Sequence, residues 1–316
     1  MATFLFRAAL FVLFQGSVAS SPSTPDTLVA LRARAQDSLD GPAQLALGRA
    51  YLEWLEHYHT RPVHTDTVWE RHALDSADDV LAHAVDAFGA PGSTAEGDSA
   101  RVLRVRGWAD RTMSAWETGG LGAAVGPLPD DLRLSPVLEE LGENLLRACP
   151  AHGVLLTAGD ADSYAAWYMR YARGLGSDRI VVPYAAWRDD PVLRARLARD
   201  LKLRPSDGAG EGWLGALVES RTVCISMGFT HPPDPPHKHI KWRVQPLVWL
   251  GGENRKTDPV PPRDFVFAAA QLSLHDHNPW GEAVVALYGR AARAAPALCE
   301  PLATFAIPQD RTGCKR

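Results

Sequence analysis

The sequence predicts an α+α/β protein. A helical-hairpin, tetratricopeptide-like (TPR-like) N-terminal half precedes a small α/β unit with a mostly parallel sheet and a closing C-terminal helix. In the first half, apolar residues recur at the three- and four-residue spacing of amphipathic helices. In the second half, short apolar runs alternate with helical segments, which is typical of parallel strands joined by helical crossovers. The expected boundaries are residues 1–20 for a signal peptide, 21–125 for the helical half and 135–316 for the α/β unit with its last helix.

The helical half contains one short tetratricopeptide-like pattern. Leu47-Gly48-x-x-Tyr51 matches the centre of such a helix, where small residues let paired helices approach closely. The period between related matches is irregular, so the pattern predicts helical hairpins, and true repeats are a further hypothesis. The helical segments include residues 26–39, 41–59, 75–89 and 99–116.

The α/β unit follows a linker rich in Gly and Pro at residues 117–131. Its closing helix has a clear start, because Asn278 is a good N-cap and Pro279 suits the first helical position. Residues 241–252 are expected to supply an edge strand or a hairpin. The other predicted elements are helix 135–150, strand 153–159, helix 162–175, strand 178–187, helix 190–203, strand 221–229 and helix 278–299.

Composition limits the classes of partner. Hydrophobic residues make up 46% of the 316-residue chain and charged residues 22%, which is typical of a globular protein with a substantial core. The formal net charge of −4 gives no electrostatic reason to expect nucleic acid or an anionic membrane surface as a partner.

The N-terminus predicts export. An apolar run at residues 8–14 follows Arg7, and the small residues Ala19 and Ser20 suit a signal-peptidase site. The run is shorter than the roughly 20 apolar residues of a membrane-spanning helix. Cleavage after Ala19 or Ser20 is expected, and an uncleaved anchor is the alternative. We expect a soluble protein of the periplasm or cell surface, without a later membrane span and open to peripheral association with a membrane complex.

Export also affects the four cysteines, because disulfides persist outside the cytoplasm. Cys299 and Cys314 bracket a short C-terminal segment, and a disulfide between them would hold the tail to the last helix. Cys224 lies in an apolar, strand-like run, where it is either a buried free thiol or a partner for Cys149.

The strongest candidate site is a Gly-Asp-x-Asp turn after the first predicted strand. Asp160 and Asp162 lie where that strand ends and a helix begins, the edge at which α/β sheets usually bind ligands. Their carboxylates could hold a divalent cation. The structural alternative is that Asp162 or Ser163 caps the helix, where negative charge suits the helix dipole. The sequence leaves both interpretations open, so all three residues are ligand-binding candidates.

A second metal hypothesis comes from histidine pairs. His237 and His239 form one His-x-His pair and His275 and His277 another, and two such pairs could complete a tetrahedral zinc site. Nothing in the sequence shows that the two segments meet. A divalent cation is the sole cofactor that the sequence suggests, and no organic cofactor is expected.

Residues 141–182 resemble the soluble C-terminal region of bacterial multi-pass membrane proteins of the protein O-mannosyltransferase-like type. Corresponding motifs are Cys149-Pro150, the turn at residues 159–164, Trp167-Tyr168 and the Val-rich run at residues 180–182. The resemblance implies an extracytoplasmic α/β unit with helical flanks. The multi-pass portion that would carry transferase chemistry has no counterpart here, so that activity is not implied.

The sequence favours a non-catalytic function, since no Gly-x-Ser-x-Gly or other complete catalytic motif occurs. We expect an exported interaction module with protein partners, serving as an accessory subunit of a cell-envelope or membrane complex. One alternative is a metal-assisted enzyme acting on a sugar or phosphate, with Asp160 and Asp162 as ligands. Another is a glycan-binding module in which Trp167 or Trp187 stacks on a sugar.

Overall fold

A computed structural model of the chain describes most of its residues. These are residues 25–37, 40–59, 67–123, 128–204, 210–234, 239–251 and 260–314. The predicted signal peptide at residues 1–20 lies outside the described residues, and so does His237.

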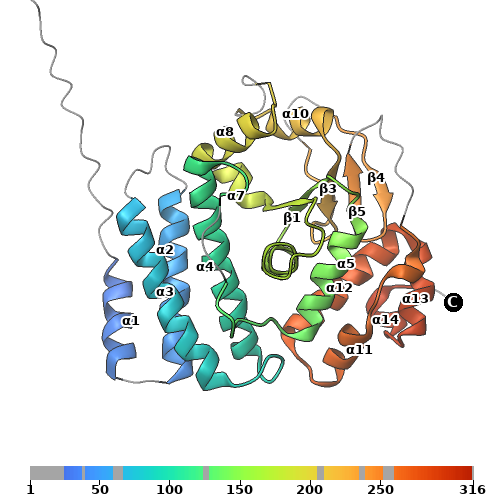
Figure 1. Cartoon of the computed structure of the whole chain (residues 1–316). Helices are drawn as coiled ribbons and strands as arrows, with labels where there is room; N and C mark the ends of the chain where they lie inside the picture. The colour runs from blue at the N-terminus through green and yellow to red at the C-terminus, as the bar shows by residue number, and fades with distance from the viewer. Residues whose placement is uncertain are drawn as a thin grey trace, which may run out of the picture.

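The N-terminal part is an array of helices lying side by side (Figure 1). Gly48 on the second helix faces Leu81 on the third so closely that a Cβ there would overlap the leucine side chain. The small residue therefore acts as expected, by letting two helices approach. Whether the hairpins are tetratricopeptide repeats stays a prediction. The helices are α1 (Asp26–Asp37), α2 (Gly41–His59), α3 (Thr67–Phe88) and α4 (Ala95–Gly119).

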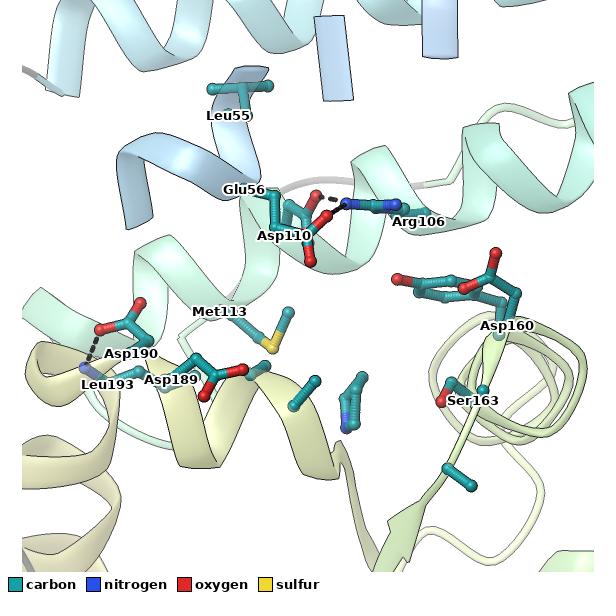
Figure 2. Close-up of a pocket in the computed structure, with 16 residues that line it drawn as sticks. Leu55, Glu56, Arg106, Asp110, Met113, Asp160, Ser163, Asp189, Asp190 and Leu193 are labelled. Carbon is teal, nitrogen blue, oxygen red and sulfur yellow. Dashed lines mark hydrogen bonds and ion pairs between the residues drawn. The ribbon is translucent and has the colours of Figure 1, made fainter. Parts of the chain in front are cut away.

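Helix α4 connects the two parts of the molecule. Leu103 packs into the apolar core of the helical array, whereas Val105, Met113 and Trp116 belong to the core of the α/β part. The helix packs against α6 (Asp160–Trp167) and α8 (Pro191–Asp200) of the α/β part. One side of α4 consequently forms a wall of the pocket shown in Figure 2.

The α/β part contains a five-stranded mixed sheet in the order β2-β1-β3-β5-β4. Strand β1 pairs in parallel with β2 and with β3, and β5 pairs antiparallel with β3 and with β4. The α+α/β class is therefore confirmed, but the expected mostly parallel sheet is a mixed one, because the predicted hairpin adds two antiparallel pairings. The strands are β1 (Val154–Thr157), β2 (Ile180–Pro183), β3 (Val223–Ser226), β4 (Arg243–Gln245) and β5 (Val248–Gly251).

Helices surround the sheet, and α5, α6 and α12 pack against one another. Gly142 on α5 lies so close to the main chain of Ala165 on α6 that any Cβ would overlap its carbonyl. The Asn278 side chain accepts a hydrogen bond from the Trp280 N–H at 2.9 Å, which confirms the predicted cap. The first group of helices is α5 (Pro136–Ala148), α6 (Asp160–Trp167) with a π-helical turn η1 (Tyr168–Ala172), α7 (Tyr184–Asp189), α8 (Pro191–Asp200) and α10 (Trp213–Ser220). The C-terminal group is η2 (Pro262–Asp264), α11 (Ala268–His275), α12 (Pro279–Ala294), η3 (Pro296–Leu298), α13 (Cys299–Thr304) and α14 (Gln309–Thr312).

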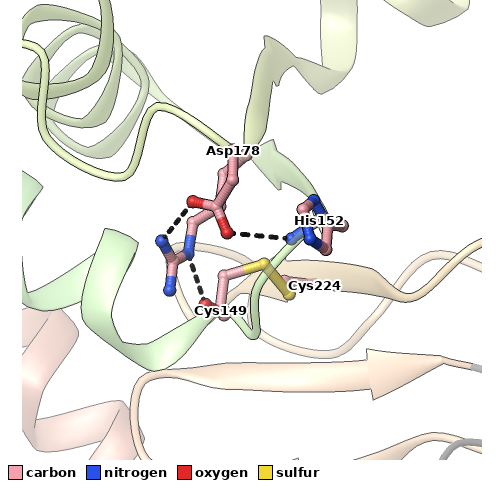
Figure 3. The surroundings of a disulfide bond; sticks show 5 residues. Cys149, His152, Asp178 and Cys224 are labelled. Carbon is pink, nitrogen blue, oxygen red and sulfur yellow. Dashed lines mark hydrogen bonds and ion pairs between the residues drawn. A yellow bond between two sulfur atoms is a disulfide. The ribbon is translucent and has the colours of Figure 1, made fainter.

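All four cysteines form disulfides. Cys149, at the end of α5, pairs with Cys224 in β3, and Cys299 pairs with Cys314 near the C-terminus. Figure 3 shows the first bridge, beside which the Arg179 side chain donates to the Cys149 carbonyl at 2.6 Å. Two disulfides fit the predicted export. None of the helices among the described residues is long and apolar enough to cross a membrane.

Glu140 on α5 gives the fold an expected pH dependence. Its carboxylate accepts hydrogen bonds from the Ala269 and Ala270 N–H groups at 2.7 and 3.0 Å, at the start of α11. Burial outweighs these donors and raises the pKa of Glu140 to about 7 from 4.5. Between these two values the unfolded chain has lost the proton that the folded chain still holds. Stability is therefore expected to fall as pH rises through this window, by up to ~3 kcal/mol.

Urea unfolding of wild type and Glu140→Gln between pH 4 and 8 measures this dependence. The glutamine keeps an acceptor oxygen but does not ionise, so we expect a flatter profile. Glu282→Gln, which removes a surface ion pair between α12 and Arg311, is the matched control. An unchanged slope in Glu140→Gln would show that another group causes the dependence.

Candidate functional site

A pocket of about 150 Å³ lies between the helical array and the carboxyl ends of β1 and β2. It is bounded by α2 and α4 on one side and by the β1–α6 turn, α7 and the start of α8 on the other. Figure 2 shows acidic side chains on several of its walls. The charged residues among those that line it are Glu56, Arg106, Asp110, Asp160, Asp189 and Asp190.

The two aspartates of the Gly-Asp-x-Asp turn have different environments. Asp162 is 2% exposed, and its carboxylate accepts hydrogen bonds from the Ala158 and Gly159 N–H groups, both at 2.8 Å. It also accepts from the Ser226 hydroxyl at the end of β3. Burial raises the pKa of Asp162. Asp162 therefore holds the turn and the β3 end together, which is the structural role that the sequence left open.

The same contacts fill the crevice between β1 and β3, where the strand order reverses and where such sheets usually bind ligands. A Cβ at Gly228 would lie against the Asp162 carboxylate. The Arg290 side chain from α12 donates to the Met227 carbonyl at 2.9 Å and to the Gly228 carbonyl at 3.3 Å. The open space at this edge is consequently the neighbouring pocket, at β1 and β2.

Asp160 is exposed and lines this pocket. Within the part of the chain that the structure describes, its carboxylate has no hydrogen bond and no ion pair. Ser163, one helical turn later, lines the pocket too, and its N–H donates to the Gly159 carbonyl at 2.9 Å. Of the sequence-predicted candidates, Asp160 and Ser163 therefore lie at an accessible site.

The other pocket carboxylates are engaged. The Arg106 guanidinium forms ion pairs with Glu56 at 2.7 Å and with Asp110 at 3.9 Å. The Asp190 carboxylate caps α8 by accepting from the Val192 and Leu193 N–H groups, both at 2.9 Å. Asp189 pairs with the adjacent Arg188.

Among the described residues that line the pocket, Tyr164 is the one aromatic side chain. It is 7% exposed, and in the described part of the chain its hydroxyl makes no hydrogen bond. Burial raises the pKa of Tyr164, and nearby Arg106 opposes this effect. The hydroxyl therefore stays protonated and available to a ligand.

No protein-family model, curated protein or solved structure matches this chain. The resemblance of residues 141–182 to O-mannosyltransferase-like proteins therefore stays a prediction.

The two tryptophans proposed to stack on a sugar are core residues, so that prediction is wrong. Trp167 and Trp187 are both 0% exposed. Trp167 packs against Trp116, with ring centroids 5.4 Å apart, and Trp187 stacks on Trp213 at 5.0 Å. Neither ring has a face left for a ligand.

The proposed metal ligands are not brought together in the described residues. His239, His275 and His277 are exposed, and His237 lies outside the described residues. Across the described ranges, no group of three or more His, Cys, Asp or Glu side chains is placed to hold a metal ion. Asp162 cannot join Asp160 as a metal ligand, because both of its carboxylate oxygens already accept hydrogen bonds from N–H groups of the turn.

The sequence patterns did not single out Arg106, Asp110 or Tyr164. The first two lie on α4, far from the turn in sequence, so their place in the pocket depends on how α4 docks. A usable signal existed in Asp189, because it follows the second parallel strand. The carboxyl ends of parallel strands meet at one sheet edge, so acidic residues after β1 and near the end of β2 could have been expected to share a site.

Proposed function

We propose that this chain is an exported, non-catalytic recognition module that binds a small ligand in the pocket between α4 and the carboxyl ends of β1 and β2. The main support for this proposal is that two neighbouring aspartates have different environments. Asp162 fulfils the structural needs of the turn, whereas the exposed Asp160 carboxylate lines the pocket without a hydrogen bond or ion pair in the described residues. The two disulfides support the exported location.

The pocket supports the phosphate-processing alternative less well. The described lining residues include five carboxylates and one arginine, and that arginine is already paired with Glu56 and Asp110. An anionic phosphate would be repelled by this surface. Membership of an envelope complex and the identity of any protein partner stay predictions from the sequence.

The proposal is tested by filling the pocket. Ala185 is an exposed lining residue, so Ala185→Trp is expected to occupy the space without disturbing the core, and Ala185→Ser is the matched control. Ligand-observed NMR with a panel of small amines, sugars, carboxylates and phosphates should detect binding of at least one class to wild type and Ala185→Ser. Binding should be lost in Ala185→Trp. If no class binds, or if Ala185→Trp binds as wild type does, the pocket is not a recognition site.

A further inference from the structure

The geometry points to a protonated amine on a short alkyl chain as the ligand of this pocket, with the Asp160 carboxylate as its counter-ion and the Tyr164 hydroxyl as a second hydrogen-bond acceptor. This inference rests on the proposed function and names the class of ligand.

The net charge of the pocket lining favours a cation. Five carboxylates and one guanidinium among the described lining residues give a formal charge of −4. Glu56 and Asp110 share Arg106, and Asp189 pairs with Arg188. Asp160 has no such compensation in the described residues. A cation beside it gains a favourable Coulomb interaction, which is stronger near a protein surface than in bulk water.

The Tyr164 hydroxyl is a recognition group that does not belong to the acidic cluster. Tyr164 is almost fully buried, yet its hydroxyl lacks a hydrogen-bond partner among the described residues and the side chain lines the pocket. The hydroxyl can be reached from the pocket, so a ligand that supplies a hydrogen-bond partner there is favoured. An ammonium group has three donors and no acceptor. The Asp160 carboxylate and the Tyr164 oxygen can each accept one of those donors.

Part of the pocket wall is apolar. Leu55, Met113, Pro183 and Leu193 line the pocket together with alanine side chains. This surface suits methylene groups rather than a second charged head. A cavity of about 150 Å³ holds a ligand the size of benzene, which has six non-hydrogen atoms. A short alkylamine fits both the volume and the lining.

Isothermal titration calorimetry with three matched probes tests the inference. n-Pentylamine carries one ammonium group, 1-pentanol replaces that group with a hydroxyl at the same length, and pentanoate carries the opposite charge. We expect the amine to bind wild type, with affinity that falls as salt is added. The alcohol and the carboxylate should bind at least tenfold more weakly.

Variants identify the recognition groups. Asp160→Asn removes the charge but keeps the shape, and we expect at least tenfold weaker amine binding. Tyr164→Phe removes the hydroxyl alone, and a three- to tenfold loss is expected. Asp75→Asn, which removes a surface carboxylate on α3 that pairs with Arg111 on α4, is the matched control and should bind as wild type does.

The outcomes separate this inference from the proposed function. If pentanol or pentanoate binds as well as the amine, and Ala185→Trp abolishes that binding, the pocket is a recognition site for another class and the amine inference is overturned. Equal amine binding by Asp160→Asn and wild type also overturns it. Amine binding retained in Ala185→Trp would indicate attraction to the acidic surface alone, which overturns the inference as well. If neither these probes nor the fragment panel binds, the proposed function fails too.

Discussion

Asp162→Ala is expected to destabilise the fold by about 3–5 kcal/mol, because it removes a buried acceptor from three donors at once. The Ala158 and Gly159 N–H groups and the Ser226 hydroxyl all donate to this carboxylate. Without this carboxylate, the three donors have no acceptor at the junction of β1, α6 and β3. Asp160→Ala should cost less than about 1 kcal/mol, because an exposed carboxylate in the first helical turn gains only from the helix dipole.

Chemical denaturation of the two variants measures this contrast directly. Asp162→Asn keeps one acceptor oxygen and should lie between wild type and Asp162→Ala. Each of the three variants removes one negative charge from the same turn, so a general charge effect would change the stability of all three alike. A loss of stability in Asp160→Ala as large as in Asp162→Ala would contradict the structural role assigned to Asp162.

Local signals were sufficient where the chain forms contacts within a short stretch of sequence. Asn278 caps α12 as its residue type predicts, since the cap needs only the next two residues. Cys299 and Cys314 pair across 15 residues, as their spacing near the chain end suggested. The alternation of strands and helices also identified the α/β part. In each case the deciding interaction lies within one or two adjacent elements.

The sequence could not assign separate roles to Asp160 and Asp162, because those roles depend on the residue at which α6 begins. Asp160 and Asp162 are two residues apart, and a shift of one or two residues in the start of α6 would exchange their roles. In the structure α6 begins at Asp160, which places Asp162 in the first turn and turns its carboxylate back to the chain before the helix. Sequence-based element boundaries do not reach that accuracy.

Features that need docking of distant elements could not be predicted. Trp167 is buried because α4 covers α6 and places Trp116 against it. The same docking brings Arg106 and Asp110 to the pocket. Neither periodicity nor residue type specifies which face of α4 packs against the helices of the α/β part, since both cores include apolar residues from α4.

Removing the Cys149–Cys224 disulfide is the second change with a large expected effect. The bridge closes a loop across 75 residues, and the chain-entropy model gives a loss of roughly 4–5 kcal/mol. It joins the end of α5 to β3, which is the strand that also carries Ser226. Losing it should therefore loosen the strand to which Asp162 is anchored.

The double variant Cys149→Ala with Cys224→Ala tests this, and Cys299→Ala with Cys314→Ala is its matched control. The control loop spans 15 residues, so its loss is expected to cost roughly 3 kcal/mol in the same model. Because the longer loop leaves more freedom in the unfolded chain, the first variant should unfold at the lower urea concentration. It should also bind pocket probes less tightly, since β3 supports the turn that positions Asp160. If the control proved the less stable of the two, strain or local packing rather than loop length would govern both disulfides.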